Sequence, residues 1–258
     1  MKLLFKSDLH LDFHVKFNKN QEKMEKEVRQ YARNMYVNTV GEEKLPVLLG
    51  GDFGNINHYA KWYLDELSKL ADHLFIVFGN HDYYVESKSQ TSKYKGHSAN
   101  RVEEIKDHFK DYSNITFLEK FEVVEYKGLK IAGATNWYKL DSFMQRMQFK
   151  MMNDSVYIRN YDIGHEGFLE DGKFDELEQV DVMLTHVCPI YTESNHLKGA
   201  ECYVSDRDLT KARHWFAGHV HEVNDYEKAG SFLHTNANGY NDELETKNNA
   251  HLFGVYEV

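Results

Sequence analysis

Five short clusters of histidine, aspartate and asparagine residues stand out in the sequence, and each lies just after an apolar run. The chain holds 15 histidines, and histidine is the commonest metal ligand among protein side chains. Imidazole, carboxylate and amide groups without thiolate suit Mn²⁺, Fe or Zn²⁺ and disfavour a structural zinc site. The clusters therefore predict metal-dependent chemistry. They are Asp8-x-His10, Gly51-Asp52-x-x-Asn55, Gly79-Asn80-His81-Asp82, Thr185-His186 and Gly218-His219-x-His221.

The apolar runs before these clusters predict short buried strands that end where the polar residues begin. Helical patterns over Glu22–Val40 and Tyr59–Leu70 separate the first three runs. Strands alternating with helices indicate a largely parallel sheet, because parallel neighbours need long crossovers. Ligands bind at the carboxyl ends of the strands in such sheets. The predicted strands before the clusters are Lys2–Ser7, Pro46–Leu49, Leu74–Phe78, Asp181–Leu184 and His214–Ala217.

The second half of the chain is richer in strands and predicts a second sheet. Phe121–Tyr126 and Leu129–Ala134 flank Lys127-Gly128 in the pattern of a hairpin. Residues 137–178 are polar, aromatic and rich in methionine, and we interpret them as an irregular or helical insertion that could form a lid. The simplest organisation is a single domain over residues 1–258.

Alternation along a strand gives an expectation for how the paired ligands are aimed. Residues i and i+2 of a strand point to the same side. Asp8 with His10, and His219 with His221, are therefore each expected to direct two ligands into one cavity.

Composition excludes several classes of protein. The 258 residues carry a net charge of −10, which argues against binding of long duplex DNA, because such proteins normally present a basic face. The apolar runs are far shorter than the roughly 20 residues of a membrane span, so we expect a cytoplasmic protein without membrane contact. Cys188 and Cys202 are too few for a disulfide framework or a thiolate zinc site.

The five clusters, in this order, resemble the pattern of the calcineurin-like metallophosphoesterase superfamily. This resemblance implies an α/β fold of four layers, αββα, with two mixed sheets flanked by helices. It also implies a metal-dependent phosphoric ester hydrolase. Three further stretches resemble a bacterial and phage subgroup of small phosphoesterases: residues 131–137, Met152-Asn153-Asp154, and Asn236 with Gly239 and Tyr240.

The resemblance further implies two divalent metal ions, with Mn²⁺ favoured and Fe, Zn²⁺ or Ni²⁺ as alternatives. Two ions can share a carboxylate and a bridging hydroxide and can stabilise an in-line displacement at phosphorus. Asp52 is the implied shared ligand. The implied ligands are Asp8, His10, Asp52 and His221 for one ion, and Asp52, Asn80, His186 and His219 for the other.

His81 is the implied general acid or leaving-group stabiliser beside the metals. Asp82 is expected to orient the His81 ring and raise its pKa, as a carboxylate beside an imidazole does. Asn55 and Tyr83 are the candidates for substrate contact, Asn55 through its amide and Tyr83, together with Tyr84, as part of a lid.

The sequence departs from the protein serine/threonine phosphatases of the superfamily, which read G-D-x-x-D-R-G and G-N-H-E. Here Asn55-Ile56-Asn57 carries no arginine, and Asp82 replaces the glutamate. The differences favour hydrolysis of a phosphodiester or phosphomonoester of a small, nucleotide-like substrate. The alternative is a nuclease acting on short or single-stranded nucleic acid, and a phosphoprotein phosphatase or a non-catalytic binding protein is less favoured. The oligomeric state stays open.

Overall fold

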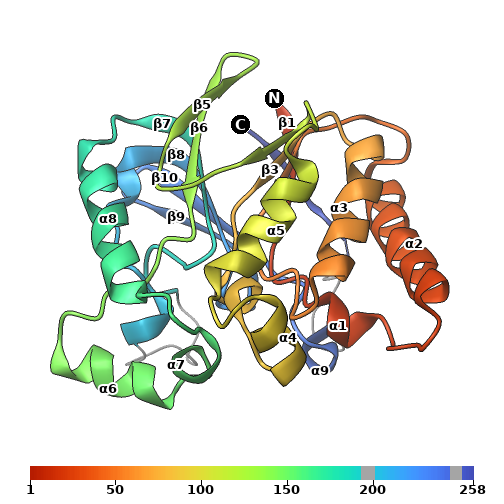
Figure 1. Ribbon diagram of the computed structural model, residues 1–258. Helices are drawn as coiled ribbons and strands as arrows, with labels where there is room; N and C mark the ends of the chain where they lie inside the picture. Colours follow the sequence, from red (N-terminus) through yellow and green to blue (C-terminus); the bar gives the residue numbers. More distant parts are fainter. Residues whose placement is uncertain (193–200, 245–251) are drawn as a thin grey trace.

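Two β-sheets face each other at the centre of the computed structural model, which describes residues 1–192, 201–244 and 252–258 (Figure 1). The first sheet has the strand order β11-β1-β2-β3-β4, and the second has the order β5-β6-β7-β8-β10-β9. The first consists of β1 (Lys2–Lys6), β2 (Val47–Leu49), β3 (Leu74–Ile76), β4 (Ile115–Phe117) and β11 (Gly254–Glu257). The second consists of β5 (Val123–Tyr126), β6 (Leu129–Ala134), β7 (Val180–Thr185), β8 (Ala212–Ala217), β9 (Val223–Lys228) and β10 (Ser231–Asn236).

Both sheets are parallel in the middle and antiparallel at an edge. Strands β1 to β4 run parallel, with Leu4 opposite Val47 and Leu49 opposite Ile76, and β11 joins β1 antiparallel. In the second sheet β6, β7, β8 and β10 are parallel, whereas β5 and β9 are antiparallel. The carboxyl ends of the parallel strands therefore gather the loops that follow them.

The layers arise from side chains that alternate along each strand. Leu4 faces the helices, whereas Phe5 faces the second sheet and packs edge-to-face with Phe216 at 5.2 Å between ring centroids. The outer face of the first sheet is covered by α2 (Gln21–Val40), α3 (Asn57–Leu70) and α5 (Ala99–Phe109). Helix α8 (Ile163–Glu176) lies beside the second sheet (Figure 1). Its Phe174 packs against Trp215 of β8. The predicted arrangement of two mixed sheets flanked by helices is confirmed.

Residues 137–178 are helical over much of their length. They contain α6 (Phe143–Met151), α7 (Asp154–Tyr157) and α8. Short helices complete the described chain: α1 (Leu11–His14), η1 (Asn80–Tyr83), α4 (Lys88–Lys93), η2 (Glu201–Tyr203), η3 (Leu209–Lys211) and α9 (Asn241–Leu244). Across the described ranges, we find no helix with the length and apolar character needed to cross a bilayer.

Candidate metal centre

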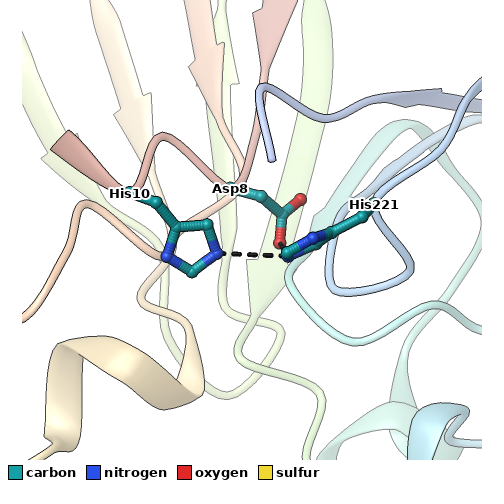
Figure 2. Close-up of side chains that lie close together, drawn as sticks. All are labelled: Asp8, His10 and His221. Atoms are coloured by element: carbon teal, nitrogen blue, oxygen red, sulfur yellow. Dashed lines mark hydrogen bonds and ion pairs between the residues drawn. The ribbon is translucent and has the colours of Figure 1, made fainter. Parts of the chain in front are cut away.

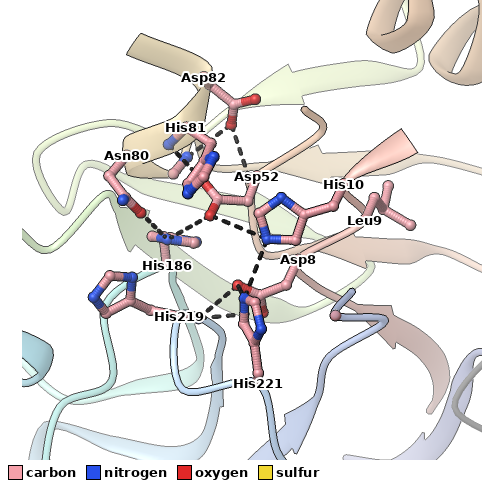
Figure 3. Close-up of polar contacts among 12 residues, drawn as sticks. Asp8, Leu9, His10, Asp52, Asn80, His81, Asp82, His186, His219 and His221 are labelled. Atoms are coloured by element: carbon pink, nitrogen blue, oxygen red, sulfur yellow. Dashed lines mark hydrogen bonds and ion pairs between the residues drawn. The ribbon is translucent and has the colours of Figure 1, made fainter. Parts of the chain in front are cut away.

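The five polar clusters meet at one end of the two sheets, in the loops that follow β1, β2, β3, β7 and β8 (Figure 3). The first sheet contributes the first three clusters and the second sheet contributes the last two. The side chains that the structure brings together here are those of Asp8, His10, Asp52, Asn80, His81, His186, His219 and His221. Residues more than 200 positions apart in sequence thereby share one site.

Left-handed backbone conformations direct these side chains, and this corrects the expectation of strand alternation. Strands β1 and β8 end at Lys6 and Ala217, before the paired ligands begin. Five residues of the site have positive φ, and each such conformation costs about 1–3 kcal/mol in a non-glycine residue. The φ values are 51° at Asp8, 40° at His10, 55° at Asp52, 69° at His219 and 50° at His221. Strain of this kind persists only where the surroundings hold it, and it concentrates at functional sites.

Close packing requires a glycine at position 79. A Cβ atom there would lie 2.2 Å from Oδ1 of Asp52 and 2.5 Å from the ring of His186. Only a residue without a side chain allows these two ligands to approach the loop so closely.

One half of the site is formed by Asp8, His10 and His221, which Figure 2 shows pointing toward one another. Nε2 of His10 lies 3.1 Å from Nε2 of His221, and the latter lies 3.6 Å from Oδ1 of Asp8. Oδ2 of Asp52 is 3.7 Å from Nε2 of His10. One ligand atom from each of Asp8, His10 and His221 lies within 4.8 Å of the other two, which is a spacing that a single cation can bridge.

The other half is centred on His186. Both ring nitrogens of His186 face oxygen acceptors, and a neutral ring can donate to only one of them. Its Nδ1 faces the carbonyl oxygen of Gly50 at 2.7 Å, and its Nε2 faces Oδ1 of Asn80 at 2.9 Å. Both oxygens are acceptors, whereas a neutral imidazole carries a single N–H. Burial lowers the pKa of His186, so the doubly protonated ring is disfavoured. In either neutral tautomer, one ring nitrogen therefore directs its lone pair at an oxygen lone pair, and the two repel each other. A cation bound between Nε2 and the Asn80 oxygen would remove this repulsion.

Two other ring nitrogens also lack a protein partner. Nδ1 of His10 and Nε2 of His219 are buried without a hydrogen bond to any of the described residues. A buried polar atom without a partner costs about 1–3 kcal/mol. The donor set and the unpartnered Nε2 of His219 together fit the binding of divalent metal ions, and the His10 nitrogen that faces the other ligands is Nε2.

In the protein without bound metal, burial shifts acidic and basic side chains of the site toward their neutral forms. Burial raises the pKa of Asp52 well above its usual range, and the nearby carboxylates of Asp82 and Asp8 raise it further. Burial lowers the pKa of His10 and of His219, and neighbouring histidines add to the shift. A cation would favour the ionised form of Asp52 and the neutral forms of the surrounding imidazoles, so the site is suited to bind positive charge.

His81 lies at the edge of this group, against Asn55 and Tyr84. Its Nδ1 is 3.2 Å from Oδ1 of Asn55, and its ring lies 4.2 Å from that of Tyr84 and 4.7 Å from that of His10. The amide of Asn55 also donates to Oε1 of Glu86 at 3.2 Å, so its oxygen faces His81. Burial, then the charges of His186 and His221, lower the pKa of His81 to about 3.

The expectation that Asp82 orients His81 and raises its pKa is wrong. Instead, the Asp82 carboxylate accepts hydrogen bonds from the backbone amides of Asp52, Phe53 and Gly79 at 2.8–2.9 Å. Consecutive residues of a tight 3₁₀ turn project in different directions, so Asp82 points into the loops while His81 points into the site. Asp82 thus holds together the two loops that carry ligands.

Tyr83 also differs from the expectation of substrate contact. It is 6% exposed, and its ring packs on Trp137 and Tyr161 at 5.3 and 4.8 Å. The next residue, Tyr84, is the tyrosine that reaches His81. Again the turn of η1 separates the directions of neighbouring side chains.

Two residues outside the clusters were missed at the sequence level. The buried guanidinium of Arg101 donates to the backbone carbonyls of His81, Tyr84 and Gly54 at 2.7–2.9 Å. Asp154 accepts a hydrogen bond from the side chain of Asn80 at 2.9 Å. Arg101 lies within α5, and no sequence motif marks it as a site residue. Asp154 belongs to Met152-Asn153-Asp154, a stretch that resembles only a subgroup of small phosphoesterases.

Comparisons of the chain with known proteins give a family match and a distant relative. The family model described as calcineurin-like phosphoesterase matches residues 1–223. Uncharacterized protein L509 of Acanthamoeba polyphaga mimivirus is 23% identical over 238 residues, which cover 81% of this chain and 82% of that protein.

Two solved structures show the same fold. Phosphopantetheinyl hydrolase (PptH) from Mycobacterium tuberculosis matches with a TM-score of 0.62 at 13% identity, over 99% of this chain and 95% of its own. TT1561 of Thermus thermophilus matches with a TM-score of 0.53 at 9% identity, over 99% and 98% of the two chains. At these identities the likeness concerns the fold alone.

Proposed function

The chain belongs to the calcineurin-like phosphoesterase family, whose members are metal-dependent hydrolases of phosphate esters, and from this premise we propose a dinuclear enzyme. It binds two divalent cations, most suitably Mn²⁺, and hydrolyses a phosphodiester or phosphomonoester of a small, nucleotide-like substrate. The observation that carries the proposal is the meeting of unsatisfied nitrogen and oxygen lone pairs around His186, Asn80 and Asp52.

Each cation has a proposed set of ligands. The first is held by Asp8, His10, Asp52 and His221, and the second by Asp52, Asn80, His186 and His219. Asp52 serves both, since its Oδ2 lies 3.7 Å from Nε2 of His10 and 3.5 Å from Nε2 of His186. When bound, such ions supply Lewis acidity toward the phosphate ester and toward water. Nitrogen and amide ligands bring no charge, so the site becomes a local attractor for phosphate within an acidic protein.

His81 is the proposed source of the proton for the leaving oxygen. A hydrogen bond from Nδ1 to Oδ1 of Asn55 fixes the ring and leaves Nε2 as the atom that holds and delivers the proton. The low pKa of His81 belongs to the protein without substrate, and an anionic phosphate beside the ring would favour its protonated form. Asn55 therefore acts on the substrate through His81 in this proposal, and a direct contact is not required.

Residues 137–178 are proposed to be an insertion that borders the site within a single domain. Their start and middle reach the ligands, since Tyr138 stacks near His219 and Asp154 contacts Asn80. A position beside the second cation would let the insertion limit the size of substrate that enters.

The test is a metal analysis followed by a substrate screen. After reconstitution with Mn²⁺ we expect two ions per chain, activity that a chelator abolishes, and restoration of that activity by Mn²⁺. In a panel of phosphomonoesters, cyclic nucleotides and oligonucleotides, the mononucleotide esters should be hydrolysed fastest. Fewer than two ions per chain after reconstitution would contradict the proposal. Faster cleavage of oligonucleotides would instead identify a nuclease.

A further inference from the structure

We propose that Asp154 is a positioning residue, which orients the amide of Asn80 so that its oxygen faces the second cation. Asp154 lies at the start of α7, 74 positions from Asn80 in the sequence, and outside the five polar clusters. The inference rests on the proposed function, because it concerns one of the two cation sites.

The Asp154 carboxylate lies at the centre of a closed set of hydrogen bonds. It is 1% exposed and accepts from Nδ2 of Asn80 at 2.9 Å. The same oxygen, Oδ1, accepts from the hydroxyl of Tyr84, and Oδ2 accepts from the hydroxyl of Tyr138 at 2.6 Å. Both tyrosine hydroxyls act as donors here, because a carboxylate only accepts hydrogen bonds.

This arrangement decides which end of the Asn80 amide faces the metal site. The oxygen and nitrogen of an asparagine side chain are almost equal in shape, so packing alone distinguishes them poorly. An ionised carboxylate only accepts hydrogen bonds. Asp154 therefore holds the NH₂ group of Asn80, and the Asn80 oxygen is left facing Nε2 of His186 at 2.9 Å. A flipped amide would present two N–H groups to a cation.

The cost of burying Asp154 also points to a specific task. A buried carboxylate costs several kcal/mol unless it is fully hydrogen-bonded. Here the three donors are neutral groups, and two of them, on Tyr84 and Asn80, lie within or beside η1. Its negative charge is also transmitted toward the ligand end of Asn80, since a carboxylate behind a metal ligand increases the donor strength of that ligand.

Calorimetric titration of the metal-free chain with Mn²⁺ tests the inference, because it follows ion binding without relying on activity. Asp154→Asn has one acceptor oxygen for three donors and loses the preference for one amide orientation. We expect roughly 10–100-fold weaker binding of the second ion, with binding of the first unchanged. Asp175→Asn is the matched control, since Asp175 is an exposed carboxylate of α8.

A charge-preserving exchange distinguishes orientation from packing. In the double variant Asn80→Asp, Asp154→Asn, either oxygen of residue 80 can serve as ligand, and the new amide at 154 can donate to it. We expect this exchange to restore most of the second-ion affinity lost in Asp154→Asn. Failure of the exchange to restore any affinity would show that Asp154 acts through packing and would overturn the inference.

The remaining outcomes separate this inference from the proposed function. Two ions in the wild-type chain with unchanged affinity in Asp154→Asn would overturn the inference alone. Fewer than two ions in the wild-type chain would overturn the proposed function. If circular dichroism shows that Asp154→Asn is unfolded, Tyr84→Phe replaces it, because the Tyr84 hydroxyl contacts both Asp154 and Asn80. Tyr84→Phe should weaken the second ion severalfold, and no change would overturn the inference.

Discussion

Strand β8 connects two groups of histidines that resemble each other in composition and differ in their bonding. His219 and His221 follow its carboxyl end and belong to the metal-site cluster with His10 and His186. His214 lies near the amino end of β8 and forms the strand-face cluster with His234 of β10 and Asp225 of β9. Both groups are histidines beside carboxylates.

The strand-face cluster satisfies its own hydrogen bonds. Oδ1 of Asp225 lies 2.6 Å from Nδ1 of His234, and Nε2 of His234 lies 3.2 Å from Nδ1 of His214. Since the carboxylate can only accept, His234 donates from Nδ1 and accepts from His214 at Nε2. Each residue occupies regular strand backbone. The cluster therefore needs no additional ligand.

In the metal-site cluster, by contrast, the ring nitrogens of His186 both face oxygen acceptors. Five residues of the site, two of them aspartates, have left-handed backbone. Two ring nitrogens lack partners among the described residues. The difference shows that unsatisfied, converging acceptors distinguish a candidate ligand set from a structural one, whereas the presence of histidine does not. Four predictions test this distinction.

The largest effect is expected from neutralising one carboxylate in each cluster. Asp52→Asn removes the ligand shared by both cations, and each cation supplies several kcal/mol of transition-state stabilisation, so kcat/KM should fall roughly 10⁴-fold. Asp225→Asn changes a carboxylate that is 68% exposed and should leave kcat/KM within about twofold. Both kcat/KM and metal content are measured for the two variants. Equal losses of kcat/KM in two folded variants would remove the distinction between the clusters.

The next effect concerns the proton delivered by His81. General acid catalysis contributes roughly 10²–10⁴-fold. His81→Ala should slow hydrolysis of a nucleotide ester by a factor in this range and slow a p-nitrophenyl ester much less, because p-nitrophenolate leaves without a proton. Metal content should stay unchanged. An equal loss on both substrates, or a loss of bound metal, would mean that His81 positions the phosphate or supports Asn80 and is not the acid.

A smaller loss is expected from filling the space between the ligands. In Gly79→Ala the new Cβ would overlap Oδ1 of Asp52 and the ring of His186, so both must shift. Displacement of reacting groups by about 1 Å costs roughly 100-fold in rate. Gly172→Ala in α8 is the control, since a Cβ there meets nothing within 4 Å. Full activity in Gly79→Ala would show that the site tolerates such displacement.

The smallest effect is a pH dependence of stability from the strand-face cluster. Burial, then the charge of His234, lowers the pKa of His214 to about 4. Between this value and about 6.5 the unfolded chain binds more protons at this residue than the folded chain, so stability decreases as pH falls through that window. The advantage of wild type over His214→Gln in unfolding free energy should therefore shrink from pH 7.5 to pH 5. Urea unfolding of the two proteins in the presence of chelator measures this difference in unfolding free energy. A difference that does not change with pH would contradict the lowered pKa of His214.

Local sequence predicted most of the strands because their apolar runs are buried on both faces. The run before Ser7 and the run before Gly50 match β1 and β2 closely. Strand β4 (Ile115–Phe117) was missed, since its three half-buried residues form no distinct apolar run. The hairpin of β5 and β6 followed from Lys127-Gly128 at its turn, where both residues have positive φ.

By itself, the sequence determined the residue types of the candidate ligands and their places at strand ends, because apolar runs and polar clusters are local properties of the chain. Only the tertiary structure decided how those residues are aimed and supported. Left-handed loops direct Asp8 and His10, a 3₁₀ turn sends His81 and Asp82 in different directions, and Asp154 reaches Asn80 from a distant helix. Hydrogen-bond partners of this kind depend on distances in space, which spacing along the chain does not contain.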